Sequence, residues 1–314
     1  MGQFGNHSGS LVPFRVVILL LLRHSRPKAV PMTTPHVAHK ASRQRFTVED
    51  PGYYLGKFQR RLYRQMVQYQ TLRDHAKGTL EKSGETIATS LGLAADSVRF
   101  TEIRDHAEKS CLVGLKVEFE LFMYIICHLV LDGTLRHVAN TGHLGSRQKR
   151  LTDLIGRKKE FYDRLVEGGL QNASDLFIEM AVPDYGLPRM RDLLGKCGIG
   201  DDLKLAAEDL AFFDASLPDT LKGCVEPWAQ IQTAFQVRHA IEHSFSRVNP
   251  DFLRKAGAVW PKSSWARHFS EVVGPKNGQR LTLDPTDVYV TASAMAAVGR
   301  KLVSIASNLD EYLT

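Results

Sequence analysis

The stretch DPTDVYVTASAMAAVGRKLVSIASNLDEYL, residues 284–313, indicates most clearly that this chain is built from helices. Asp284 stands where a helix-capping residue is expected, and Pro285 takes the first helical position, which its fixed φ angle favours. The apolar residues that follow recur at helical spacing and share one side: Val288, Ala292, Met295, Leu302, Ile305, Leu309 and Leu313. We therefore predict a long amphipathic closing helix over 284–313.

The same spacing occurs earlier in the chain. Residues 53–80 carry one apolar stripe, formed by Tyr54, Phe58, Leu62, Met66, Tyr69 and Leu72. Further helices are expected at 104–131, 147–167, 201–215 and 225–246, separated by glycine and proline breaks. The apolar run 112–131 contains charged residues and is typical of a buried core helix. Only 97–101 and 280–283 fit short extended segments, so the sequence predicts an all-α fold, a helical bundle.

The composition is that of an ordinary folded soluble protein: of 314 residues, 43% are hydrophobic and 24% are charged. No repeat period and no low-complexity linker divide the chain after its first part. We expect a single α-helical domain over 46–314, with an insert at 132–223 and a motif-bearing core at 225–313.

Residues 1–45 are expected to be disordered or a mis-assigned N-terminal extension. The apolar run Leu11–Leu22 is too short to cross a membrane, and the cationic residues Arg23, Arg26 and Lys28 follow it, which is the wrong order for a secretory signal. A start at Met32 would remove the run, together with four of the seven net positive charges. The rest of the chain is only mildly basic, so charge alone does not predict nucleic-acid binding, and no membrane contact is expected.

The four cysteines lie far apart in the sequence: Cys111, Cys127, Cys197 and Cys224. None forms a C-x-x-C pair, so neither a zinc site nor a disulfide framework is indicated. Reduced and mostly buried thiols predict a cytoplasmic protein.

The window FQVRHAIEHSFSRVNPDFL, residues 235–253, concentrates the chemically capable side chains. Arg238, His239, Glu242, His243 and Arg247 all fall within it. Arg238 and His243 are five residues apart, which places them roughly 140° apart around an ideal helix. One site would therefore need a frayed helix end or a second subunit.

This window resembles the motif of the HEPN superfamily, the higher eukaryotes and prokaryotes nucleotide-binding domains. The family pattern is an Arg, a polar residue next to it, and a His after four to six intervening positions, as in Arg238-His239-Ala-Ile-Glu242-His243. A turn with Asn249 and Asp251, a short extended piece and a final helix from Asp284 extend the resemblance over about 225–313. It departs from the family at His239, where Asn is commoner. The resemblance implies a HEPN-type helical bundle.

What the resemblance implies about function is metal-independent endoribonuclease activity in a homodimer, as in toxin and phage-defence members. RNA would be the substrate, no cofactor would be needed, and an inhibitory antitoxin-like partner is compatible. His243 would be the general acid or base, Arg238 would clamp the phosphate, and His239 would orient it. Arg247 and Glu242 would contribute to the substrate site, although Glu242 also suits a simple ion pair.

Two other classes of function remain open from the sequence. Some HEPN members have lost catalysis and serve as nucleotide-binding, RNA-binding or protein-interaction modules, and a cluster of Arg, His and Glu can also be a salt-bridged helix end. His239-Ala-Ile-Glu242-His243 further spells H-x-x-E-H, a zinc-peptidase motif whose third ligand would be Glu271 or Glu311. The other histidines, among them His268, have no metal spacing. No P-loop, dinucleotide fingerprint or G-x-S-x-G sequence is present.

Overall fold

The computed structural model describes residues 50–75, 90, 100–141, 163, 187–197, 199, 204–269, 274–309 and 311. Within these residues there are seven α-helices, three short 3₁₀ helices and no strand, which confirms the all-α prediction. One isolated antiparallel bridge joins Arg247 to Arg280, and Arg280 is the first residue of the predicted extended segment 280–283.

The chain divides into two compact units. Unit 1 lies within 124–201 and 308–314, together with the N-terminal segment, and unit 2 lies within 50–123 and 202–307. The single domain over 46–314 stays a prediction. Much of the predicted insert at 132–223 lies outside the described residues, as do 1–45.

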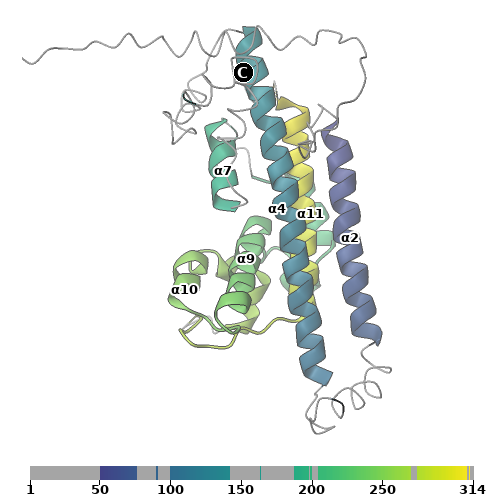
Figure 1. The fold of residues 1–314 in the computed structure, drawn as a ribbon, viewed down its shortest axis with the longest axis vertical. Coiled ribbons are helices and arrows are strands. Elements are labelled where there is room, and N and C mark those ends of the chain that lie inside the picture. The colour runs from purple at the N-terminus through teal and green to yellow at the C-terminus, as the bar shows by residue number, and fades with distance from the viewer. Residues whose placement is uncertain are drawn as a thin grey trace, which may run out of the picture. The chain divides into compact units, whose positions relative to one another are not determined.

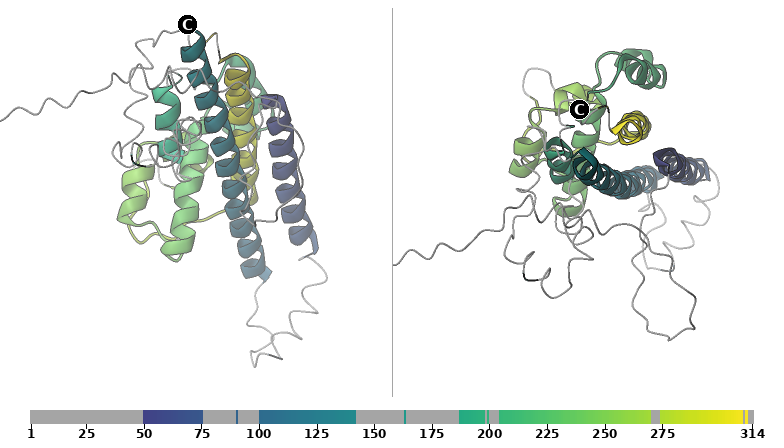
Figure 2. Two further views of the ribbon diagram at one scale, coloured as in Figure 1. Left: turned by 45° about the horizontal axis from the view of Figure 1, so that its top comes forward. Right: turned by 90° about the horizontal axis from the view of Figure 1, so that it is seen from above.

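Three long helices form the frame of unit 2 (Figures 1 and 2): α2 (Pro51–His75), the first half of α4 (Phe100–Thr141) and α11 (Pro285–Ser307). The α2 and α4 helices run antiparallel, because Phe58 stacks on Phe122 at 4.2 Å between ring centroids while Tyr69, eleven residues later on α2, donates to Glu108. On the outer side, Arg61 pairs with Glu118 at 3.1 Å. Of the predicted α2 stripe, Tyr54, Phe58, Leu62 and Tyr69 are buried, whereas Leu72 is 55% exposed.

Helix α11 packs closely against both α2 and α4 at a glycine, Gly299. A Cβ placed on Gly299 would come within 3.0 Å of the Phe58 ring and 3.4 Å of the Phe122 ring. Because rings cannot give way as flexible side chains do, glycine at this position lets the three helices approach closely.

The remaining elements of unit 2 pack around this frame. They are α8 (Ala207–Ala215), α9 (Pro227–His243), α10 (Pro250–Ala256) and the 3₁₀ turns η5 (Asp219–Leu221), η6 (Trp260–Lys262) and η7 (Ser264–His268). Helix α9 packs along α11, and α10 packs on α9. Trp265 in η7 is fully buried, so η7 belongs to the core of the unit.

Several predicted boundaries differ from the observed ones. The helix expected at 225–246 is α9 and ends at His243, because Phe245 and Ser246 have left-handed φ angles of 50° and 58°. The predicted extended segment 97–101 is wrong at Phe100 and Thr101, which begin α4. The closing helix ends at Ser307, and the predicted helix at 147–167 lies outside the described residues, apart from the helical residue 163.

Unit 1 contains the second half of α4 and α7 (Leu187–Lys196), a helix that was not predicted because prolines were interpreted as breaks, and Pro188 lies in its first turn. A proline in the first helical turn removes an N–H that has no partner in the helix, so it is compatible with a helix start. The Cys127 thiol faces the Met190 carbonyl at 3.7 Å. Burial raises the pKa of the Cys197 thiol to about 12, as expected for an unreactive core thiol.

All four cysteines are free, and only Cys224 is exposed, as the sequence predicted for reduced thiols. Among the described helices, α11 alone is long and apolar enough to cross a membrane by length and composition, and 61% of its most apolar window is buried inside the protein. That burial is typical of a core helix.

Candidate functional site

The predicted site residues lie on the last two turns of α9 and on the turn that follows. Helix α9 begins at Pro227, and apolar residues hold it in the core up to Ala240, which is 1% exposed. The last two turns of the helix also present polar side chains to solvent, with the His239 side chain 42% exposed and the His243 side chain 60% exposed. The motif therefore lies at a helix end that solvent reaches.

Glu242 connects the Arg and the His of the motif. Its Oε2 atom pairs with Nη1 of Arg238, one helical turn earlier, and lies 3.7 Å from Nε2 of His243. The carboxylate thus lies next to both residues, although they project about 140° apart around the helix. Nε of Arg238 is buried and makes no hydrogen bond with the described residues. The guanidinium is only partly satisfied by Glu242.

His239 and His243 form a pair of imidazoles. Their ring centroids are 4.6 Å apart, as expected for residues one turn apart on the same face. The pKa of His239 lies below its ordinary value, first because of partial burial and then because of the positive charges of His243, Lys255 and Arg238. The negative charge of Asp251 acts against these effects and raises the pKa of His239. The lowered pKa favours the neutral imidazole of His239, which is the form that can accept a proton.

Helix α10 brings a further charged group to the motif. Asn249 caps this helix by accepting from the Phe252 N–H at 2.7 Å. The cap places Asp251 with its Oδ2 atom 4.0 Å from Nε2 of His239, and Asp251 also pairs with Lys255 at 2.7 Å. Hydrogen bonds from Lys255 and Arg254 keep the pKa of Asp251 below its usual range. From the sequence, Asp251 was expected only in a turn, and no role was assigned to it.

Arg247, the fifth predicted site residue, does not join the cluster by any described contact. Its Nη1 atom donates to the Gly278 carbonyl at 2.8 Å, which ties the turn after α9 to the segment before α11. Its predicted role in substrate binding stays a prediction.

The zinc alternative lacks a third ligand among the described residues. No other His, Cys, Asp or Glu there places a ligand atom close to both His239 and His243 in a metal-like cluster. Glu271 lies outside the described residues, and Glu311 belongs to unit 1.

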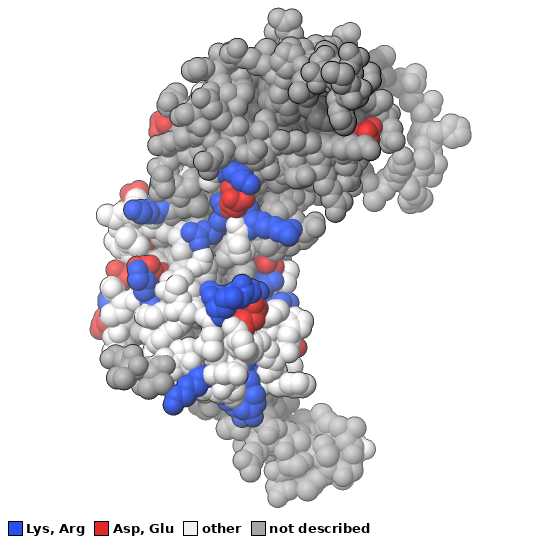
Figure 3. Space-filling model, turned by 90° about the vertical axis from the view of Figure 1, so that its left-hand side faces the viewer, with Lys and Arg blue, Asp and Glu red and all other residues white. Residues whose placement is uncertain are grey.

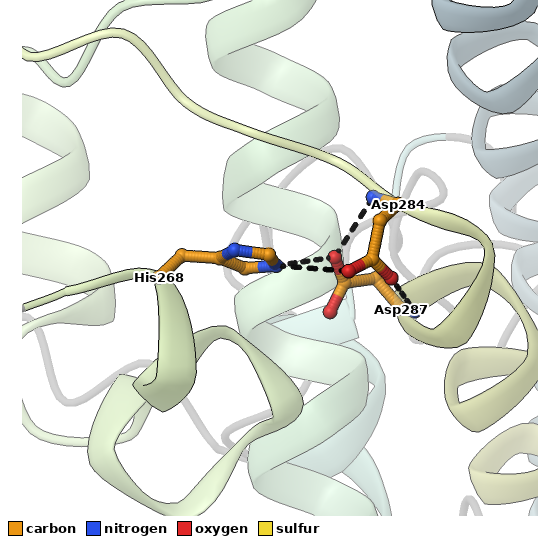
Figure 4. A group of neighbouring side chains, drawn as sticks. All are labelled: His268, Asp284 and Asp287. Carbon is orange, nitrogen blue, oxygen red and sulfur yellow. Dashed lines mark hydrogen bonds and ion pairs between the residues drawn. The ribbon is translucent and has the colours of Figure 1, made fainter.

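A second polar cluster, at the start of α11, was missed by the sequence analysis (Figure 4). Asp284 accepts from the Thr286 and Asp287 N–H groups, and Asp287 accepts from the Asp284 N–H at 3.0 Å, which closes a reciprocal cap. Asp287 is fully buried and also accepts from His268 at 2.8 Å and from Ser264 at 2.7 Å. The D-x-x-D spacing was the available signal, but the contact with His268 is not readable from the sequence.

This second cluster has the donor set of a small cation site, since His268, Asp284 and Asp287 bring their ligand atoms within 4.8 Å of one another. However, Nη2 of Arg267 lies 2.6 Å from Asp284 and 2.8 Å from Asp287. The guanidinium already supplies the positive charge that a metal would bring. Gln230 on α9 extends the network, because it donates to Ser264 and Thr291 at 3.0 Å each. We therefore interpret this cluster as a structural network that joins η7, α9 and α11.

The basic residues do not form one continuous patch on the face drawn in Figure 3, where several Lys and Arg side chains of the described residues lie beside Asp or Glu. A polyanion bound on that face would therefore depend on contacts with individual basic side chains more than on a broad positive electrostatic field.

Comparison of the chain with protein-family models, with curated proteins and with solved structures finds no match.

Proposed function

We propose that this protein is a metal-independent endoribonuclease of the HEPN type, with its site at the exposed end of α9. The observation that best supports the proposal is the juxtaposition of Arg238, His239, Glu242 and His243 at one helix end open to solvent. These groups provide a phosphate-binding cation and proton carriers, which are what RNA cleavage without a metal requires.

In the proposed reaction the ribose 2′-oxygen attacks phosphorus and the bond from phosphorus to the 5′-oxygen breaks. A base takes the 2′-OH proton, and an acid gives a proton to the departing 5′-oxygen. The products are a 2′,3′-cyclic phosphate and a 5′-hydroxyl. Arg238 would hold the phosphate oxygens, which requires Glu242 to share or release the guanidinium.

As they lie in the structure, His239 and His243 of one chain are too close together to serve both proton transfers. Each imidazole must come within about 3 Å of its own oxygen on opposite sides of the phosphorus. A phosphate between two such hydrogen bonds needs more room than the 4.6 Å that separates the two ring centroids. This geometry favours the homodimer of the proposal, in which His243 of one chain and His243 of its partner face the same phosphate.

The second candidate is a module that binds RNA or nucleotide, or a protein partner, without turnover. The ion pair of Arg238 with Glu242 favours the protein-partner form of this candidate, because a neutralised guanidinium is a poorer clamp for phosphate. An inhibitory antitoxin-like partner and a cytoplasmic location, which fits the free cysteines, belong to the main proposal.

The test is incubation of the full-length protein with total tRNA and mRNA in excess EDTA. Wild type should cleave and leave 2′,3′-cyclic phosphate ends, and RNA with a 2′-deoxy residue at the cleaved position should resist. Arg238→Ala and His243→Ala should each lower the rate roughly 10²- to 10⁴-fold. His106→Ala, which removes an exposed histidine of α4, is the matched control and should cleave like wild type.

Other outcomes separate the candidates. Binding without cleavage by wild type would support the module, whereas activity abolished by EDTA would support the zinc peptidase motif as a metal site. If His243→Ala only lowers the melting temperature, the motif is a structural helix end. Sedimentation as a monomer at micromolar concentration would contradict the shared site.

A further inference from the structure

The turn after α9 presents one aromatic ring to solvent in a conformation that the side chain does not favour. Phe245 is 94% exposed, the highest value among the exposed large apolar side chains of the described residues, and its φ angle is 50°. A bulky residue at positive φ is a rare conformation, and such residues cluster at functional sites.

The turn is held in place from both sides, so Phe245 cannot relax into an ordinary conformation. The buried Ser246 donates its N–H to the Ala240 carbonyl at 3.1 Å and accepts from the Leu281 N–H at 2.8 Å. The side chain of Asn249 donates to the Ser244 hydroxyl at 2.5 Å. These bonds fix the residues before and after Phe245, while the ring itself projects into solvent.

The surroundings of the ring are polar. Its sequence neighbours are two serines, with His243 before them and Arg247 after them, and residues 238–255 contain four Lys or Arg against two acids. The other exposed large apolar side chains of the described residues belong to α2, α4, α8 and α11. A protein-docking surface would need a contiguous apolar patch, whereas a single exposed ring in a segment rich in cations and histidines suits a flat base attached to a phosphate chain.

We propose that Phe245 is a stacking platform for an unpaired nucleobase next to the scissile phosphate, so that the site takes single-stranded rather than duplex RNA. The proposal rests on the proposed ribonuclease function, because it places the strand at the same end of α9. A paired base would not offer its face to the ring, since it remains stacked within its own helix.

The test measures binding by fluorescence anisotropy at one fixed salt concentration, with the full-length His243→Ala protein to prevent cleavage. The probes are a labelled 12-nucleotide RNA of mixed sequence and the blunt duplex of that sequence. Adding Phe245→Ala should weaken single-strand binding roughly 5- to 150-fold and leave duplex binding unchanged. Phe245→Trp should retain binding, and Tyr63→Ala, which removes another exposed ring on α2, should change nothing.

Phe245→Gly distinguishes a binding role from a structural one. Glycine accepts the left-handed conformation, so this variant should unfold at a higher temperature than wild type and still lose single-strand binding. Equal single-strand binding by Phe245→Ala and its parent, or no single-strand binding by the parent, would overturn the proposal. So would a dimer that dissociates on Phe245→Ala, since the ring would then lie between two copies.

The two proposals fail in different ways. Cleavage by the otherwise wild-type protein that is unaffected by Phe245→Ala would refute the platform and leave the ribonuclease standing. Single-strand binding that depends on Phe245, without cleavage by wild type, would refute the ribonuclease and leave a binding module with this platform.

Discussion

Replacing Asp287 should destabilise unit 2 more than replacing any exposed carboxylate. Its carboxylate is fully buried and accepts from Ser264 at 2.7 Å, Arg267 at 2.8 Å, His268 at 2.8 Å and the Asp284 N–H at 3.0 Å. Removing one member of a buried charged network costs about 3–5 kcal/mol, because the partners are left uncompensated. The Arg267 and His268 side chains are 31% and 15% exposed and regain some water, so we expect about 3 kcal/mol for Asp287→Ala.

The pH dependence of stability provides a second readout. Burial by itself would raise the pKa of Asp287, but the bonds and charges of His268, Ser264 and Arg267 outweigh it and keep the pKa below the usual value. A carboxyl with a lowered folded-state pKa stabilises fully above its unfolded pKa of about 3.9 and loses this contribution as the pH falls through the folded value. Asp287→Asn should lack that acid-dependent component, and its destabilisation should therefore shrink toward low pH.

The assay is urea unfolding followed by tryptophan fluorescence. All three tryptophans, Trp228, Trp260 and Trp265, belong to unit 2, so their signal reports on this unit. Asp219→Asn removes an exposed carboxylate that pairs with Lys222 and should leave the transition almost unchanged. A loss below about 1 kcal/mol for Asp287→Ala would refute the assignment of the cluster as a structural network.

Three further predictions concern packing, capping and thiol reactivity. Gly299→Ala should destabilise the protein by about 1–3 kcal/mol in urea unfolding, because its Cβ would meet the Phe58 ring at 3.0 Å. Gly56→Ala, whose Cβ would meet only the flexible tip of an arginine at 3.9 Å, should stabilise it by up to about 1 kcal/mol. Equal effects of the two substitutions would contradict the close approach of the helices. Asn249→Ala removes the cap of α10 and should lower the free energy of unfolding by about 1 kcal/mol, with an unchanged transition as the contrary result. A maleimide in native buffer should label Cys224 alone among the four cysteines, which mass spectrometry would show. Rapid labelling of a second cysteine would mean that the part of the core around that buried thiol opens readily to solvent.

Some features of the α9 motif could be predicted from neighbouring residues in the sequence, and others could not. The i, i+4 spacing of Arg238 with Glu242 and of His239 with His243 follows from helix periodicity, so their pairing was within reach of the sequence. The end of the helix at His243 was not predicted. Phe245 and Ser246 adopt left-handed angles because hydrogen bonds to the segment before α11 hold the turn, and neither residue type favours that conformation by itself.

The sequence by itself determined the helical class, most helix positions and the capped start of α11, because periodicity and capping depend on residues within one or two turns of one another. Only the tertiary structure decided that Asp251 of α10 lies beside His239 and that His268 reaches Asp287. It also decided that the ring of Phe245 is left in solvent. These contacts and exposures involve segments that are far apart in the sequence, so they depend on how the helices pack around α11 and not on local sequence patterns.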